Sequence, residues 1–363
     1  MNHFPRPIHT SHGLSLIELM VALAISAILL LGVATIYSAS KRSYEVSDQF
    51  AILQENARYA LHRLTKEIRM AGYTGCKDLN ETSISMIAGN PPTELSNFNV
   101  NTYVKGHHHD GSNWTTDFDT SPPTDTGRSG KIVTSADAIT IRKASACSAA
   151  ISAAGDSADA DLNIVRDNCG FKQHEILLVT DCQTTDMFTK TNKKPATVIE
   201  HATTDEENNE KNTKGELSTI FDTTAHVMRA EAVTYYIGTD TDKNKHLYRQ
   251  RLEAYGGEYK NIVSQLIPNV ENMVIQYGID TDGDESIDEI QGAEEVGTDW
   301  DKVLSVYLRL LFYTDNVGNS HKAYTFNGVT YDGVGANPAL PTDKRFRREF
   351  TTTINLRNRI HYK

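Results

Sequence analysis

The chain has 363 residues, which is room for one large domain or two modest ones. Its formal net charge of -11 argues against nucleic acid as a principal partner, because binding to phosphates needs clustered Lys and Arg. Hydrophobic residues make up 39 % of the chain, enough to build a packed globular core.

A long apolar stretch lies near the N-terminus. From Leu19 to Tyr37 every residue is apolar or small, and a helix of this length extends about 28 Å, enough to cross the hydrocarbon core of a bilayer. One charge, Glu18, lies inside the wider apolar segment. A carboxylate at membrane depth costs at least roughly 2.5 kcal/mol unless something pairs with it, so we expect a functional role for Glu18. The alternatives are a cleaved secretory signal and a buried core helix, but no small-x-small cleavage site follows before Lys41.

The residues ahead of this stretch carry a resemblance. Gly13-Leu14-Ser15-Leu16-Ile17-Glu18 follows a short polar leader and resembles the processing site of type IV pilins and type II secretion pseudopilins. The resemblance implies that prepilin peptidase cleaves after Gly13, that Leu14 is then N-methylated, and that Glu18 becomes the fifth residue of the mature chain. Family members more often have Phe or Met in place of Leu14, which bears on the efficiency of methylation and not on the class. Residues 1–13 are therefore predicted to be a leader peptide.

The helical pattern continues beyond the apolar stretch. Apolar residues recur at spacings of three and four along one stripe, formed by Phe50, Leu53, Ala57, Ala60, Leu64 and Ile68. No Pro interrupts the run from Leu14 to Ala71, and Gly72 is a stop signal. We therefore predict one helix with a transmembrane and assembly half (residues 14–40) and an amphipathic half (41–72). A β-rich globular domain is predicted to follow over residues 73–363.

The segment that ends this helix narrows the resemblance. Leu53 to Cys76, LQENARYALHRLTKEIRMAGYTGC, is similar to the PilW family of minor pilins. Further matches to that family occur in the same order downstream, at residues 176–183, 270–284 and 350–359. Together with the segment at the end of the helix, these matches span nearly the whole chain.

The remainder of the chain reads as a β-sheet domain. Six alternating or β-branched runs predict strands at residues 137–142, 175–180, 232–237, 246–250, 271–277 and 303–313. The last run alternates apolar and polar residues, which is typical of an antiparallel sheet with one covered face, and the stripe of the long helix is its natural cover. The predicted fold class is α+β, a type IV pilin-like helix on an antiparallel sheet, with long loop insertions at residues 77–135, 203–216 and 328–342.

An acidic loop gives the strongest chemical signal outside the anchor. Carboxylates at positions one, three, five and nine (Asp280, Asp282, Asp284 and Asp288), with the backbone carbonyl of Ser286 at position seven, have the spacing with which a hard cation gathers oxygen ligands. Without a cation these acids repel one another, whereas Ca²⁺ converts the repulsion into binding energy. The loop is therefore a candidate Ca²⁺ site.

This loop departs from the EF-hand pattern. An EF-hand requires Gly at position six and a bidentate Glu at position twelve, where this chain has Glu285 and Gln291. Gly283 at position four supplies part of the backbone freedom. The alternative interpretation is a solvated acidic hairpin between two strands.

Four cysteines, Cys76, Cys147, Cys169 and Cys182, all follow the membrane segment. Their even number fits disulfides in an oxidising compartment such as a periplasm, and no pair has the Cys-x-x-Cys spacing of a zinc site. Three connectivities are open. We expect Cys169 to pair with Cys182, because they flank a predicted strand at a spacing that closes a short loop, and Cys76 to pair with Cys147.

No catalytic motif is present in the sequence: there is no GxSxG, no HExxH and no phosphate-binding glycine loop. We expect a structural protein and not an enzyme. The resemblance implies a minor pilin that primes type IV pilus assembly and sits at the filament tip, supporting adhesion, twitching motility and DNA uptake.

The resemblance also implies partners and a location. Expected partners are other minor pilins, the major pilin, prepilin peptidase and the inner membrane, with a tip adhesin as a further candidate. The globular domain would be periplasmic before assembly and part of the pilus afterwards. Two alternatives remain open: the large minor pseudopilin of type II secretion, and a signal-anchored Ca²⁺-dependent adhesin that never enters a filament.

Overall fold

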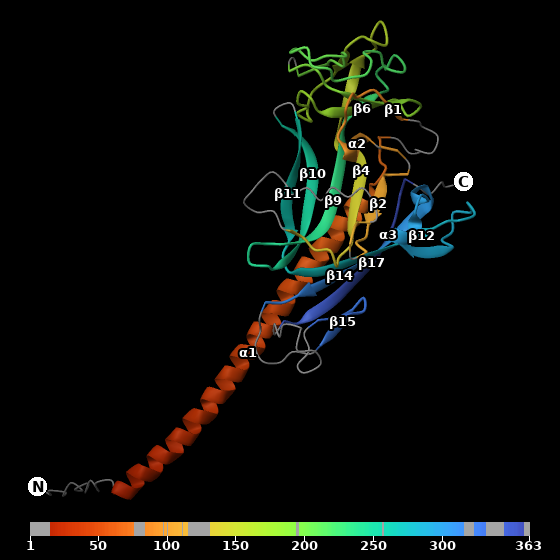
Figure 1. Ribbon diagram of the computed structural model, residues 1–363. Coiled ribbons are helices and arrows are strands. Elements are labelled where there is room, and N and C mark those ends of the chain that lie inside the picture. The colour runs from red at the N-terminus through yellow and green to blue at the C-terminus, as the bar shows by residue number, and fades with distance from the viewer. Residues whose placement is uncertain are drawn as a thin grey trace, which may run out of the picture.

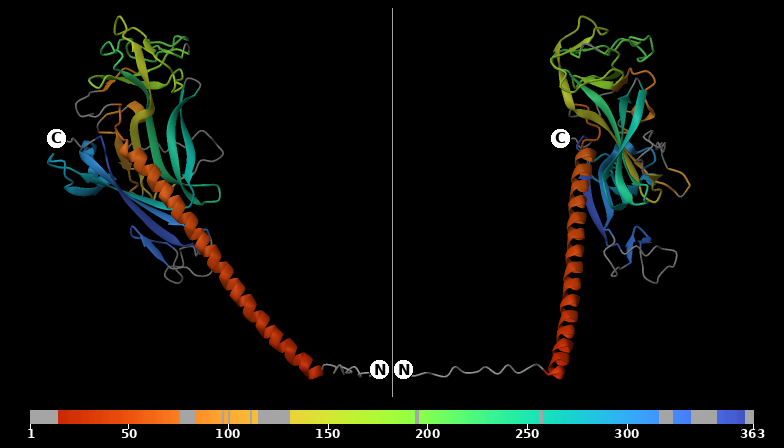
Figure 2. Two further views of the ribbon diagram at one scale, coloured as in Figure 1. Left: turned by 180° about the vertical axis from the view of Figure 1, so that it is seen from behind. Right: turned by 90° about the vertical axis from the view of Figure 1, so that its left-hand side faces the viewer.

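A single long helix projects from a β-rich head (Figure 1). The computed structural model describes residues 15–75, 84–96, 98–99, 101–110, 112–114, 131–193, 196–255, 258–315, 323–331 and 345–358. Helix α1 (Leu16–Arg69) contains 54 residues and is therefore about 81 Å long. Its front half lies clear of the head in both views of Figure 2, and its rear half packs against the head. The observed fold class is α+β, as predicted.

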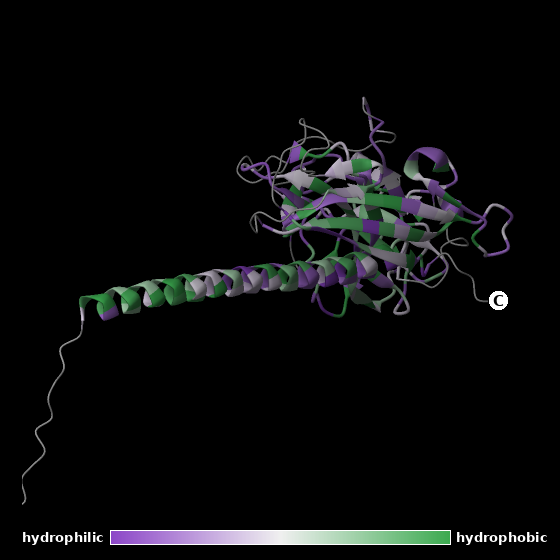
Figure 3. Ribbon diagram, turned by 90° about the horizontal axis from the view of Figure 1, so that it is seen from below, coloured by the Kyte–Doolittle hydropathy of each residue, from purple (hydrophilic) through white to green (hydrophobic). Residues whose placement is uncertain are grey.

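The rear half of α1 is held by the predicted stripe. Leu53, Ala57, Ala60, Leu64 and Ile68 are buried. In Figure 3 the front half of the helix is mostly hydrophobic, whereas hydrophilic and hydrophobic residues are mixed along the rear half. The helix ends two residues before the predicted Ala71, and Gly72 then adopts a positive φ of 72° that suits Gly.

The larger sheet has 11 strands within the described residues. They are β1 (Ile84–Met86), β2 (Val104–His107), β3 (Lys131–Ile132), β4 (Ala138–Ala153), β5 (Leu162–Ile164), β6 (Ile176–Thr180), β7 (Thr185–Thr189), β8 (Val198–Ile199), β9 (His226–Thr239), β10 (Lys245–Tyr255) and β11 (Glu258–Ile267). The main path runs β1-β7-β6-β9-β4-β5-β8, while β10 joins β9 to β11. The pairings are antiparallel except for β1 with β7.

The smaller sheet has the order β13-β12-β14-β17 and is antiparallel throughout. Its strands are β12 (Val270–Ile279), β13 (Glu289–Gly292), β14 (Val303–Tyr313) and β17 (Arg347–Asn355). The remaining elements are the hairpin β15 (Tyr324–Phe326) and β16 (Val329–Tyr331), the short helices α2 (Thr93–Ser96) and α3 (Ala293–Val296), and a 3-10 turn at Trp300–Lys302. All six sequence-predicted runs are strands, and β4, β9 and β10 are longer than predicted.

The main core lies between α1 and the two sheets. It combines the buried helix stripe with apolar side chains of β4, β9, β12 and β14, including Ile141, Tyr235, Ile275 and Leu308. The rear half of the helix is therefore a structural layer of the head.

The predicted loop insertions contain more order than expected. The stretch 77–135 includes β1, α2, β2 and β3. In the acidic stretch 203–216, Asp205 and Asn212 are buried. The Asp205 carboxylate accepts from the backbone N–H groups of Glu207 and Asn209, and the Asn212 side-chain amide donates to the carbonyl of Thr189. Composition indicated a loop in both places, but it could not reveal which polar groups the fold would cover.

Glu67 does not belong to the predicted apolar stripe, yet it is buried with it. Glu67 is only 8 % exposed, because its carboxylate forms ion pairs with Arg63 (2.9 Å) and with the Lys143 ammonium on β4 (2.8 Å). A buried charge is tolerated only when it is paired in this way. The ion pair between Glu67 and Lys143 links the last turns of α1 to the sheet.

We predict that Glu67→Gln lowers the free energy of unfolding by about 3 kcal/mol, because it leaves the buried Lys143 ammonium without its nearest carboxylate. The matched control is Glu55→Gln on the same helix, where the pair with Arg58 is exposed to solvent; it should change stability by less than about 0.5 kcal/mol. Urea unfolding of the full chain in detergent, followed by circular dichroism, measures both. Equal effects of the two variants would contradict the role given to Glu67.

Candidate functional site

The front half of α1 presents an uncovered apolar surface. Large hydrophobic side chains from Leu16 to Tyr37 are all more than half exposed, with Leu16 at 78 %. Within the described residues, α1 is the one helix that is long and apolar enough to cross a membrane. Such a surface needs lipid or other apolar helices to cover it.

Glu18 lies in the first turn of this helix and closes a capping box with Ser15. The Ser15 hydroxyl accepts from the backbone N–H of Glu18 (3.4 Å), and the Glu18 carboxylate accepts from the backbone N–H of Ser15 (2.9 Å). The carboxylate also lies at the positive end of the helix dipole. The sequence prediction missed this local partnership, although the Ser-x-x-Glu spacing is its signal. The predicted processing residues Gly13 and Leu14 lie outside the described residues.

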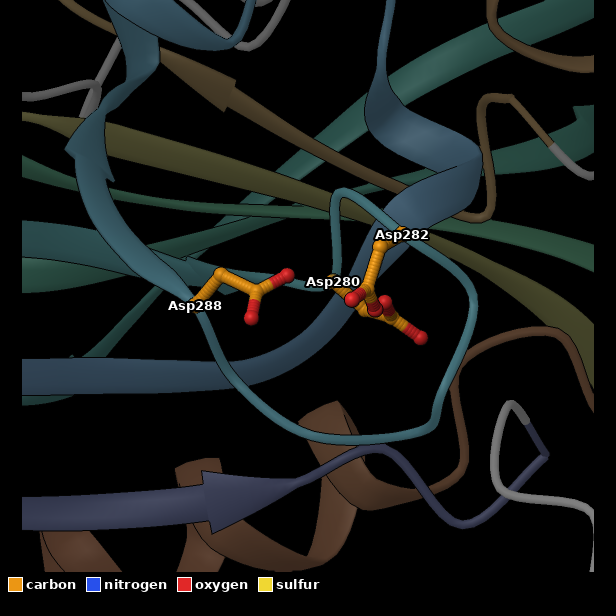
Figure 4. Close-up of side chains that lie close together, drawn as sticks. All are labelled: Asp280, Asp282 and Asp288. Carbon is orange, nitrogen blue, oxygen red and sulfur yellow. The ribbon is translucent and has the colours of Figure 1, made fainter.

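The acidic loop connects β12 to β13, two antiparallel neighbours of the smaller sheet. Figure 4 shows the side chains of Asp280, Asp282 and Asp288 directed into one space inside this loop. Each of the three contributes a carboxylate oxygen, and these oxygens lie within 4.8 Å of one another. Three converging carboxylates form a partial oxygen shell suited to a hard divalent cation.

Backbone hydrogen bonds hold two of these carboxylates in place. Asp280 accepts from the N–H groups of Gly283 (2.6 Å) and Glu285 (2.8 Å). Asp288 accepts from the N–H (2.7 Å) and the hydroxyl (2.8 Å) of Thr281, and these hydrogen bonds hold the pKa of Asp288 below its usual value. Asp288 therefore remains a carboxylate at neutral pH, as a cation ligand must.

The remaining predicted ligands have other positions. Asp284 is not in the converging group, and its carboxylate accepts from the N–H of Ser286 (2.7 Å). Glu285, which occupies the position where an EF-hand has Gly, adopts the same left-handed backbone (φ 69°) that Gly283 adopts nearby (φ 83°). The loop thus makes its sharp turn without Gly at position six, and a left-handed non-Gly residue costs roughly 1–2 kcal/mol.

Both predicted cysteine pairings, Cys169 with Cys182 and Cys76 with Cys147, are wrong. Cys169 is bonded to Cys147 of β4, not to Cys182. Strand β6 separates Cys169 from Cys182, and its five residues extend about 17 Å, so the two cysteines lie toward opposite ends of the strand. Cys182 is also in a disulfide, whose partner lies outside the described residues, as does Cys76.

Comparison with known proteins adds two family matches. Residues 8–34 match the prokaryotic N-terminal methylation motif, and residues 234–358 match PilW, the type IV pilus-assembly protein W. The chain is a protein of the type IV pilin family. Within that family the two matches together support a minor pilin, whose family members are structural, non-enzymatic proteins. No curated protein and no solved structure matches this pilin.

The two matches cover different parts of the pilin. The methylation motif includes Gly13, Leu14 and Glu18 and runs into the exposed part of α1. The PilW match begins within β9 and continues to the end of β17, so it takes in the smaller sheet and the acidic loop. The apolar helix and the motif fit an inner-membrane-anchored pilin that ends up in the pilus.

We predict that a non-reducing peptide map of the purified pilin contains a peptide pair linking Cys147 to Cys169. Closing this loop, with a sequence separation of 22, contributes about 3 kcal/mol by the chain-entropy estimate. The double variant Cys147→Ser and Cys169→Ser should lose about that much stability in urea unfolding. A map in which Cys169 is linked to Cys182 would contradict the pairing.

Proposed function

We propose that this pilin is a minor pilin that joins other minor pilins in a complex priming type IV pilus assembly. The observation that carries the proposal is the bare apolar front half of α1, which begins at a pilin processing motif. Priming requires a few such helices to bundle, because each covers the apolar surface of its neighbours. Once a bundle exists, further pilins have a surface on which to add.

The size and placement of the head support a position at the filament tip. The head packs against one side of only the rear part of α1, and it extends well past the end of that helix (Figure 1). A subunit within a helical filament must fit neighbours above and below, whereas a terminal subunit has neighbours on one side only. At the tip this pilin would serve adhesion, twitching motility and DNA uptake, with a tip adhesin and the major pilin among its partners.

Processing and orientation follow from the same proposal. Prepilin peptidase cleaves after Gly13 and the new N-terminus at Leu14 is methylated, while the head faces the periplasm until assembly. Glu18 then neutralises the amine of Leu14 or that of an adjoining subunit, which removes two charges from an apolar setting. In the unprocessed chain the same carboxylate accepts from the Ser15 N–H, so it is already held near the start of the helix.

We predict that the Glu18→Ala variant is produced and reaches the membrane but assembles poorly into pili. The N-terminal amine of Leu14 then lacks a counter-charge. The matched variant is Glu18→Gln, which keeps the capping hydrogen bond with Ser15 and loses only the charge. Both variants should reduce piliation to the same degree, measured by counting surface pili in a strain carrying each variant. Normal piliation with Glu18→Gln would assign the role to the cap and not to the charge.

Two other functions can be separated from this one by experiment. A pseudopilin of type II secretion would require that deletion of the gene abolish exoprotein secretion; we expect loss of surface pili with secretion intact. For a membrane-anchored adhesin, Gly13 would be dispensable; we expect that changing Gly13 blocks processing and assembly. Mass spectrometry of sheared pili provides the direct test, since it should find a peptide that begins at methylated Leu14.

We also propose that the acidic loop binds Ca²⁺. The convergence of Asp280, Asp282 and Asp288 in a loop organised by its own backbone supports this function. Bound Ca²⁺ would stiffen the connection between β12 and β13. Backbone carbonyls and waters would complete the oxygen shell of the ion.

We predict that isothermal titration of the full chain with CaCl₂ gives saturable heat, and that Asp282→Ala or Asp288→Ala abolishes it. At 100-fold excess over the dissociation constant, Ca²⁺ should raise the free energy of unfolding by about 2.7 kcal/mol. The control is Asp242→Ala, which removes one acid from another acidic turn outside the converging group and should leave the heat unchanged. Absence of heat at millimolar Ca²⁺ would refute the site.

A further inference from the structure

A charged cavity of about 400 Å³ lies beside the end of α1. It is bordered by the last turns of α1, by β9 and β10, by Tyr259 of β11 and by the turn before β6. Its volume falls within the range of small-molecule sites. Neither the pilin matches nor the proposed function assigns any role to it.

Strand register explains why charges gather here. Arg229, Glu231, Val233 and Tyr235 alternate along β9 and therefore lie on one face, and Arg249 of β10 pairs with Tyr235 on that same face. Lower on this face the apolar residues pack against α1. Near the C-terminal end of α1, the same face of β9 and β10 carries charged residues, and these line the cavity.

The lining carries four glutamates, and each has a basic partner. The pairs are Glu67 with Arg63 and Lys143, Glu231 with Lys143, Glu175 with Arg229, and Glu253 with Arg251. The acidic charge of the lining is thus already matched.

One positive charge and several hydrogen-bond donors of the lining have no partner among the described residues. Arg249 forms no ion pair with any residue that the structure describes, and its buried Nε finds no acceptor there. The Nε of Arg63 and the hydroxyl of the fully buried Tyr235 likewise have no hydrogen-bond partner among the described residues. Burial raises the pKa of Tyr235, so its hydroxyl keeps its proton and remains a donor. The Nε of Arg229, which also lines the cavity, is a fourth such donor, and a buried donor without an acceptor costs roughly 1–3 kcal/mol.

The chemistry of the lining selects the ligand. A free guanidinium matches a carboxylate through two parallel N–H···O bonds. The glutamates already pair with Arg63, Arg229 and Arg251, so Arg249 is the one guanidinium of the lining without a described carboxylate partner, and a single guanidinium suits a monoanion better than a dianion such as phosphate. The remaining lone pairs of the glutamates can accept hydrogen bonds from hydroxyl groups.

We propose that this cavity binds a small hydroxylated carboxylate, the chemistry of a sugar acid. Its carboxylate pairs with Arg249 and accepts from Arg63 and Tyr235, and its hydroxyl groups donate to the glutamates. The pilin head is thereby a receptor for an acidic ligand as well as a filament subunit.

The test is titration of the detergent-solubilised full chain with sodium glucuronate, followed by calorimetry. Glucuronate should bind saturably, and glucose, which lacks the carboxylate, should not. Arg249→Gln should weaken binding at least tenfold, and Tyr235→Phe, which removes only the hydroxyl, several-fold. Arg58→Gln makes the same substitution on the exposed side of α1, away from the cavity, and should bind as the unmodified protein does. Thermal unfolding establishes that each variant is folded.

Three results would overturn the proposal. The first is absence of saturable glucuronate binding at millimolar concentration. The second is binding that folded Arg249→Gln retains in full. The third is displacement of glucuronate by inorganic phosphate at lower concentration than unlabelled glucuronate requires, which would make the cavity a phosphate site.

Discussion

The contact between the rear half of α1 and the sheets is the interaction on which the rest of the structure depends. Ala57 and Ala60 are completely buried at its centre, and their small side chains allow the helix backbone to lie close to the strands. Leu53, Leu64 and Ile68 extend the contact on either side. Because this one stripe fixes both the rotation and the depth of the helix, it also decides which part of α1 is left uncovered.

The same contact organises the polar chemistry of the head. Where the apolar stripe ends, Glu67 turns toward Lys143 and Arg63, and the helix-facing surface of the sheet changes from apolar to charged. The cavity beside the end of α1 lies where the sheet surface changes from apolar to charged residues. Packing and charge are therefore arranged along one axis, from the apolar front of α1 to the charged upper part of β9 and β10.

The sequence predicted the features that depend on periodicity. The stripe from Leu53 to Ile68 and the six principal strands repeat at 3.6 and 2 residues, and each was placed correctly. Features that depend on distant partners were not predictable. Glu67 looks solvent-facing on a helical wheel, and its partner Lys143 lies 76 positions away.

The cysteines and the acidic loop illustrate the same limit. Proximity in sequence suggested Cys169 with Cys182, yet an extended strand separates the two, and the partner of Cys169 is Cys147 of β4. In the acidic loop the spacing of carboxylates was informative, and the structure gathers Asp280, Asp282 and Asp288. Asp284 is not in that group, and its carboxylate accepts from the backbone N–H of Ser286, a contact that spacing alone does not specify.

The unbroken course of α1 has a mechanical consequence. Within its 54 residues there is no Pro, and the single glycine, Gly32, lies in the exposed front half. A pull applied to the front of the helix therefore travels along its hydrogen-bonded axis and reaches the head as shear across the Ala57 and Ala60 contact. Such a load is shared by all buried side chains of the stripe at once, and the Glu67 ion pairs resist sliding at its far end. The joint is thus suited to bear tension, and its failure would require the whole stripe to slip together.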